Sequence, residues 1–130
     1  MKARAMHLVS VILVALLSAC ATGPQFTDAE RASILTPISC ASRSECDVIW
    51  SRLQAWVATN STWRIQTAND VIIQTFGPGA HRTDVAYSLV RTPQSADSAI
   101  ITIRAGCDNI FGCHPDPVDA IHRMKAAVGK

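Results

Sequence analysis

Two alternating runs decide the fold of this chain: Trp63-Arg64-Ile65-Gln66-Thr67 and Val71-Ile72-Ile73-Gln74-Thr75, joined by Ala68-Asn69-Asp70. In each run the side chains change character at a period of 2, which is the pattern of a β-strand with one buried face. The joining residues favour a turn, because Asn and Asp side chains hydrogen-bond to the nearby backbone. The sequence therefore predicts a β-hairpin over 63–75.

Two more strands follow this hairpin. Phe76-Gly77-Pro78-Gly79 breaks the second strand and opens a loop to about Thr83. Alternation then resumes and predicts a third strand over 85–91, ending near Pro93, and a fourth over 99–105 after a turn at 94–97.

Helical periodicity flanks the strands on both sides. Ser42-Arg43-Ser44-Glu45 is a capping box, and the apolar residues after it predict a helix to about Asn60. Asp116-Pro117 places an N-cap aspartate before a first-turn proline and predicts a last helix that ends near Gly129. The two apolar faces are Cys46, Ile49, Trp50, Leu53, Trp56 and Val57, and Val118, Ile121, Met124 and Val128.

These elements define the fold class. Short connections favour an antiparallel meander, and the apolar face of such a sheet must be covered. The predicted fold is an α+β two-layer sandwich, in which a four-stranded antiparallel meander is covered on one face by two helices, in the order α-β-β-β-β-α. Thr27 and Glu30 form another capping box, which predicts a brief extra helix to about Leu35, closed by Pro37.

The N-terminus has the features of an export signal. Lys2 and Arg4 precede the apolar run 8–17, which ends in Leu17-Ser18-Ala19-Cys20. A membrane-spanning helix needs about 20 consecutive apolar residues, so this run is too short to span. A charged start, an apolar stretch and small residues at the cut fit a secretory signal. The sequence L-S-A-C resembles the lipobox of bacterial lipoproteins, and a plain secreted protein is the alternative.

The resemblance implies lipidation of Cys20. Its sulfur would receive a diacylglyceryl group, the chain would be cut before it, and the new N-terminus would be acylated, with palmitate as a typical chain. Residues 1–19 would then be the signal peptide, 20–26 a lipidated tether and 27–130 one small α+β domain. In enterobacterial lipoproteins, an aspartate directly after the cysteine resembles a signal for retention in the inner membrane, and this chain has Ala21 there. We therefore expect the protein to be anchored in the outer membrane, facing the periplasm, rather than in the inner membrane. The chain is similar to small uncharacterised proteobacterial outer-membrane lipoproteins.

Charge narrows the class of partner. The whole chain carries 12 basic and 10 acidic residues, and loss of Lys2 and Arg4 with the signal would balance the two. Since no basic run remains, we expect no nucleic-acid partner.

Four cysteines remain besides Cys20, as two C-x5-C spacings. An even count in an exported chain indicates disulfides, and four cysteines allow three pairings. In an up-and-down sheet the two spacings would lie a strand's length apart, about 17–20 Å, whereas a disulfide needs Cα atoms within about 7 Å. We therefore predict the local pairs Cys40–Cys46 and Cys107–Cys113.

Two loops contain residues that could bind a metal or a small ligand. Cys107, Cys113 and His114 are residue types that bind zinc, but zinc sites usually use C-x2-4-C pairs, so we expect a disulfide and no metal. Gly77, Gly79, His81 and Asp84 form a candidate ligand loop, which could bind a small anion through backbone amides or expose an acid–base pair. The alternative is a purely structural role as a solvated hairpin connection, because no phosphate-loop or nucleophile-elbow motif is present.

Ile110 and Phe111 lie within the second cysteine loop. Two large apolar residues in a tight loop either pack into the core or form a partner contact.

Three functions follow from these features. The leading hypothesis is a noncatalytic envelope lipoprotein with a structural or accessory role, bound to the membrane by its lipid and to another envelope protein in the periplasm. The second is a small-ligand or cell-wall-binding module that uses a sheet edge or the loop from Gly77 to Asp84. The weakest is a small hydrolase using His81 with Asp84 or His114, because no activated nucleophile accompanies them. We predict no cofactor.

Overall fold

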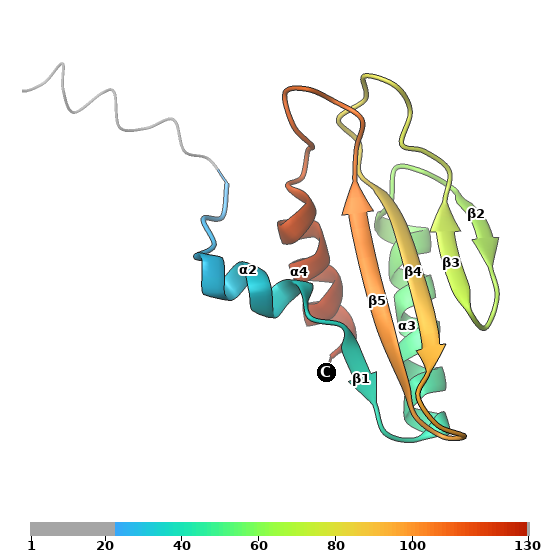
Figure 1. Cartoon of the computed structure of the whole chain (residues 1–130). Coiled ribbons are helices and arrows are strands. Elements are labelled where there is room, and N and C mark those ends of the chain that lie inside the picture. The colour runs from blue at the N-terminus through green and yellow to red at the C-terminus, as the bar shows by residue number, and fades with distance from the viewer. Residues whose placement is uncertain (1–22, 130) are drawn as a thin grey trace, which may run out of the picture.

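Figure 1 shows the computed structural model, which describes residues 23–129. The predicted signal peptide, Cys20 and the start of the tether lie outside the described residues. The elements in chain order are α2 (Asp28–Leu35), β1 (Ile38–Cys40), α3 (Arg43–Asn60), β2 (Ile65–Ala68), β3 (Ile72–Thr75), β4 (Ala86–Pro93), β5 (Ala99–Gly106) and α4 (Pro117–Val128).

The strands form one antiparallel sheet in the order β1-β5-β4-β3-β2. The predicted meander corresponds to β2 through β5, paired in chain order, and the α+β class is confirmed. The predicted strand count is wrong, because the described chain has five strands and not four. Its three helices are the two that were predicted to cover the sheet and α2, the brief helix predicted after Thr27. β1 adds to the edge of β5, where Ile38 pairs with Ile101. A strand of three residues is too short to show alternation, and its partner lies far along the chain.

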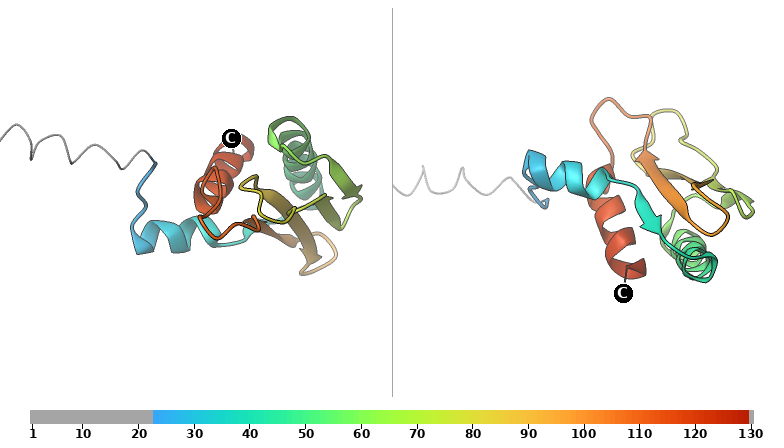
Figure 2. Two further views of the ribbon diagram at one scale, coloured as in Figure 1. Left: turned by 90° about the horizontal axis from the view of Figure 1, so that it is seen from above. Right: turned by 60° about the horizontal axis from the view of Figure 1, so that its bottom comes forward.

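Helices α3 and α4 lie side by side on one face of the sheet (Figures 1 and 2). Alternation along the strands decides which side chains meet them: Leu89 and Ile101 are fully buried there. Leu53 of α3 and Met124 of α4 are fully buried in the same core. The core between the two layers is therefore the one that the hairpin and helical patterns predict.

The predicted helix starts are confirmed by their caps. The Ser42 hydroxyl accepts a hydrogen bond from Glu45 N at 3.2 Å, and Asp116 accepts from Val118 N at 2.9 Å. Thr27 and Glu30 form a full capping box at the start of α2, and hydrogen bonds from the Thr27 backbone and side chain lower the pKa of Glu30. Each cap satisfies backbone N–H groups that would otherwise have no helical partner.

Helix α2 packs against α4 and brings the N-terminal end of the described chain alongside it (Figure 1). The Phe26 ring meets His122 edge-on, with 5.3 Å between ring centroids. Lys125 Nζ donates to the Thr36 carbonyl, just beyond the end of α2. This end of the chain thus enters at the flank of α4.

Both predicted disulfides are present. Cys40–Cys46 has a Cα–Cα distance of 5.3 Å and Cys107–Cys113 one of 5.5 Å. The first joins β1 to the start of α3, and the second lies beyond β5, at the opposite end of the sheet. A strand's length separates the two pairs, which is why only local pairing is feasible.

Candidate functional site

The loop between β5 and α4 contains an exposed apolar pair, Ile110 and Phe111. Within the Cys107–Cys113 ring, Asn109 Oδ1 accepts from Phe111 N at 2.9 Å, and Gly112 N donates to the Asn109 carbonyl at 3.1 Å. Gly112 has φ of 97°, in a region that side chains disfavour. This turn leaves Ile110 90% and Phe111 91% exposed. Packing of the pair into the core, one of the two alternatives, is therefore excluded.

This loop pairs with the loop that joins β3 to β4. Ala80 bridges to Asp108 and Asp84 bridges to His114, both in parallel sense. Asn109 Nδ2 donates to the His81 carbonyl at 2.6 Å, so one amide both closes its own turn and joins the second loop. We name residues 76–85 and 107–116 together the tip (top of Figure 1).

Trp63 supports the tip from below. A Cβ atom on Gly77 would lie 2.8 Å from the Trp63 ring, and one on Gly79 would lie 2.9 Å from it. Trp63 Nε1 donates to the Asp84 carbonyl at 3.2 Å. The Arg82 guanidinium lies over the ring, 5.4 Å from its centroid. The two glycines therefore let the loop pass close over the indole.

The candidate ligand loop thus has a structural explanation for most of its residues. Gly77 and Gly79 meet Trp63, and the Asp84 carboxylate forms an ion pair with Arg82. His81 has φ of 60° and an exposed side chain, and its carbonyl holds Asn109. The Asp84 carboxylate is consequently engaged by Arg82, and not by His81 as the acid–base hypothesis requires.

His114, at the end of the tip, also lines a small cavity on the helix side of the sheet. The cavity has a volume of about 220 Å³ and opens between α3, α4 and the start of β4. Its lining includes Trp56, Tyr87, His114 and Arg123. Tyr87 is buried and meets Trp56 edge-to-face, with 5.7 Å between centroids. The alternating pattern over 85–91 predicts a strand that contains Tyr87. No local sequence pattern indicates that side chains of both helices surround this residue.

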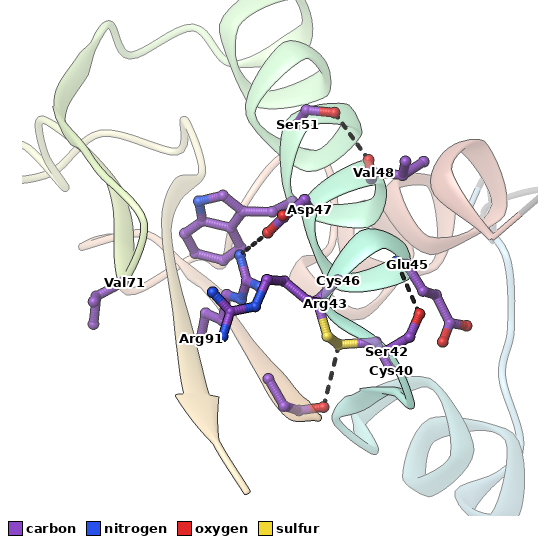
Figure 3. Close-up of polar contacts among 12 residues, drawn as sticks. Cys40, Ser42, Arg43, Glu45, Cys46, Asp47, Val48, Ser51, Val71 and Arg91 are labelled. Carbon is purple, nitrogen blue, oxygen red and sulfur yellow. Dashed lines mark hydrogen bonds and ion pairs between the residues drawn. A yellow bond between two sulfur atoms is a disulfide. The ribbon is translucent and has the colours of Figure 1, made fainter. Parts of the chain in front are cut away.

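A larger hollow of about 450 Å³ lies at the opposite end of the sheet, between α3 and the turn after β4. Arg91 Nη1 lies 2.8 Å from Asp47 Oδ1 (Figure 3), and Arg43 Nη2 donates to the Ala96 carbonyl at 3.1 Å. Next to it, the Cys40–Cys46 disulfide fixes the start of α3. Both arginines thus connect α3 to the β4–β5 hairpin, and we assign these contacts to the packing of the fold.

Within residues 23–129, no three His, Cys, Asp or Glu side chains lie where they could hold one metal ion. No helix in that range has the length and apolar character needed to cross a membrane.

No family model, curated protein or solved structure matches the chain.

Proposed function

We propose that this chain is a noncatalytic lipoprotein of the outer membrane, anchored through Cys20, which binds another envelope protein in the periplasm through Ile110 and Phe111. The proposal combines the lipobox with the exposure of these two side chains, and the exposure is the observation that carries it. Its role is structural or accessory.

The tip has the properties of a contact surface. Full burial of an aliphatic or aromatic side chain contributes about 1.5–3 kcal/mol, so two of them supply a useful share of a binding free energy. The ring closure and the Asn109 hydrogen bonds hold the pair in place before binding, which lowers the entropy lost on association.

The position of the N-terminal end of the described chain also supports a contact surface at the tip. The described part begins beside α4, where Phe26 contacts His122, and not at the loops of the tip. A tether of residues 20–26 would therefore attach at the flank of the domain and leave Ile110 and Phe111 accessible.

The loop geometry also favours binding over catalysis. Hydrolysis by His81 would need an orienting carboxylate and a nucleophile within hydrogen-bond reach. The carboxylate of Asp84 binds Arg82 instead.

The test is crosslinking of the lipidated protein in native membranes, followed by affinity purification and mass spectrometry. A double variant, Ile110→Ser with Phe111→Ser, should reduce the yield of the crosslinked envelope protein at least tenfold. The matched control is Val48→Ser with Val71→Ser, which removes two apolar side chains that are about half exposed and lie outside the tip. The control should retain the crosslinked partner.

Equal yields from the two double variants would overturn the assignment of the contact to the tip. Vesicle binding that the tip variant abolishes, with no loss of the crosslinked protein, would mean that Ile110 and Phe111 enter the bilayer instead. An intact mass that shows Cys20 unmodified in the native host would overturn the anchor.

A further inference from the structure

The cavity between α3 and α4 is a separate site from the apolar pair. The C-terminal turn of α3 supplies Trp56 and Asn60, β4 supplies Tyr87, and α4 supplies Arg123. Four apolar residues also line it: Trp56, Val85, Pro115 and Ala120. At about 220 Å³ it is smaller than the ~300 Å³ or more of sites for drug-sized ligands, so it suits a ligand of one ring.

The hydroxyl of Tyr87 is the polar group that this cavity leaves open to a ligand. Tyr87 as a whole is only 5% exposed and its hydroxyl has no hydrogen-bond partner among residues 23–129, yet no buried side-chain nitrogen or oxygen in that range lacks one. The hydroxyl oxygen therefore reaches solvent at the cavity, where a ligand can replace water as its partner. Burial raises the pKa of Tyr87, so the hydroxyl keeps its proton and can both donate and accept.

The charges at the cavity cancel. Arg123 forms an ion pair with Asp119 one helical turn earlier, and the Asp119 side chain is 7% exposed. An anionic ligand would gain little from a guanidinium that already holds a carboxylate, and a cationic ligand would meet Arg123 itself. The guanidinium has five N–H groups, so donors remain for a neutral ligand.

Asn60 adds the complementary acceptor. Its side-chain nitrogen donates to the Trp56 carbonyl and to Thr59 Oγ1, both at 2.9 Å. The side-chain oxygen is left to accept. The cavity thus presents donors, an acceptor and a group that does both beside apolar side chains, and Ser61, Thr62 and His114 add further polar groups to its lining.

We infer that this cavity binds a single neutral sugar ring. Sugar hydroxyls donate and accept at once, which matches Tyr87, Arg123 and Asn60, whereas the C–H groups of the ring match Trp56 and Pro115. The ligand is a saccharide unit, either a free sugar or one residue of a wall glycan.

The test is a titration of the protein, purified from its membranes in a sugar-free detergent, followed by tryptophan fluorescence. The probes are N-acetylglucosamine, a soluble peptidoglycan glycan fragment and inorganic phosphate. We expect saturable binding of the sugars, and at least tenfold weaker binding in Tyr87→Phe, with the same melting temperature because the hydroxyl has no partner to lose. Ser88→Ala, a neighbouring hydroxyl outside the cavity lining, should bind like the wild type.

Tighter binding of the glycan fragment than of the monosaccharide would identify the source as the cell wall, and equal binding would identify a free sugar. Absence of saturation by either sugar would overturn the inference. Equal affinity of Tyr87→Phe and the wild type, or displacement of the sugar by phosphate, would also overturn it. None of these outcomes depends on Ile110 and Phe111.

Discussion

At the scale of single residues, Gly79 tests how the tip is built. An added Cβ would lie 2.9 Å from Trp63, and Gly79 has no positive φ to complicate the substitution. We expect Gly79→Ala to lower the free energy of unfolding by about 1–3 kcal/mol through overpacking against the indole. Urea unfolding followed by tryptophan fluorescence measures the change.

Gly106 is the matched control, because a Cβ there would meet nothing within 4 Å. Gly106→Ala should leave stability unchanged or raise it by about 0.4–1 kcal/mol, since alanine restricts the unfolded chain. Equal effects at the two glycines would mean that the loop does not rest on Trp63.

The residues of the tip and of the cavity show how much of the candidate site the sequence predicts. It singled out Gly77 and Gly79 because glycines mark tight turns, and the apolar pair because two large apolar residues are unusual in a short loop. It did not predict that Asn109 reaches His81, because this contact joins two loops through the folded sheet. Tyr87 was missed for a similar reason: its neighbours in the cavity come from both helices.

At the scale of elements, the sequence was informative where a pattern was long. Helices α3 and α4 and the strands β2 to β5 carry periodicity or caps over several residues, and each is present in the structure. β1 has three residues between two helices, and it is a strand only because the edge of β5 has backbone groups to pair with. Pairing of that kind depends on tertiary structure and leaves no local pattern.

The two disulfides make an element-scale prediction, because they close loops of the same length in different surroundings. Chain entropy gives each about 2 kcal/mol. Cys40 and Cys46 are also buried against Ala99, whereas Cys107 and Cys113 are only half-buried. We expect Cys40→Ala with Cys46→Ala to cost about 1–2 kcal/mol more than Cys107→Ala with Cys113→Ala, because buried sulfur atoms leave a cavity.

Urea unfolding of the two double variants measures this difference. The second variant should lose only the chain-entropy share, about 2 kcal/mol. It should also weaken crosslinking of the proposed envelope partner, because the ring that holds Ile110 and Phe111 is opened. Equal stability losses would contradict the role assigned to burial at the first pair.

At the scale of the whole molecule, one main core joins the helices to the sheet. Ile34 of α2, Trp50 and Leu53 of α3, and the inner residues of the sheet belong to the same buried cluster, and the Cys40–Cys46 pair with Ala99 forms a small second one. A small domain with one main core usually unfolds as one unit. Helix α2, next to the predicted tether, should therefore share its stability with the remainder of the domain.

Ile34 and its neighbour Leu35 test this unity, because Ile34 is 9% exposed and Leu35 is 51% exposed. Ile34→Ala should cost about 2–5 kcal/mol, as large-to-small changes in a core do. Leu35→Ala should stay within about 0.5 kcal/mol, as surface changes do. In Ile34→Ala, the transitions followed by far-UV circular dichroism and by tryptophan fluorescence should shift together. If helical signal were lost first while the tryptophan transition stayed in place, α2 would be a separate unit, and force on the proposed lipid tether would reach only that helix.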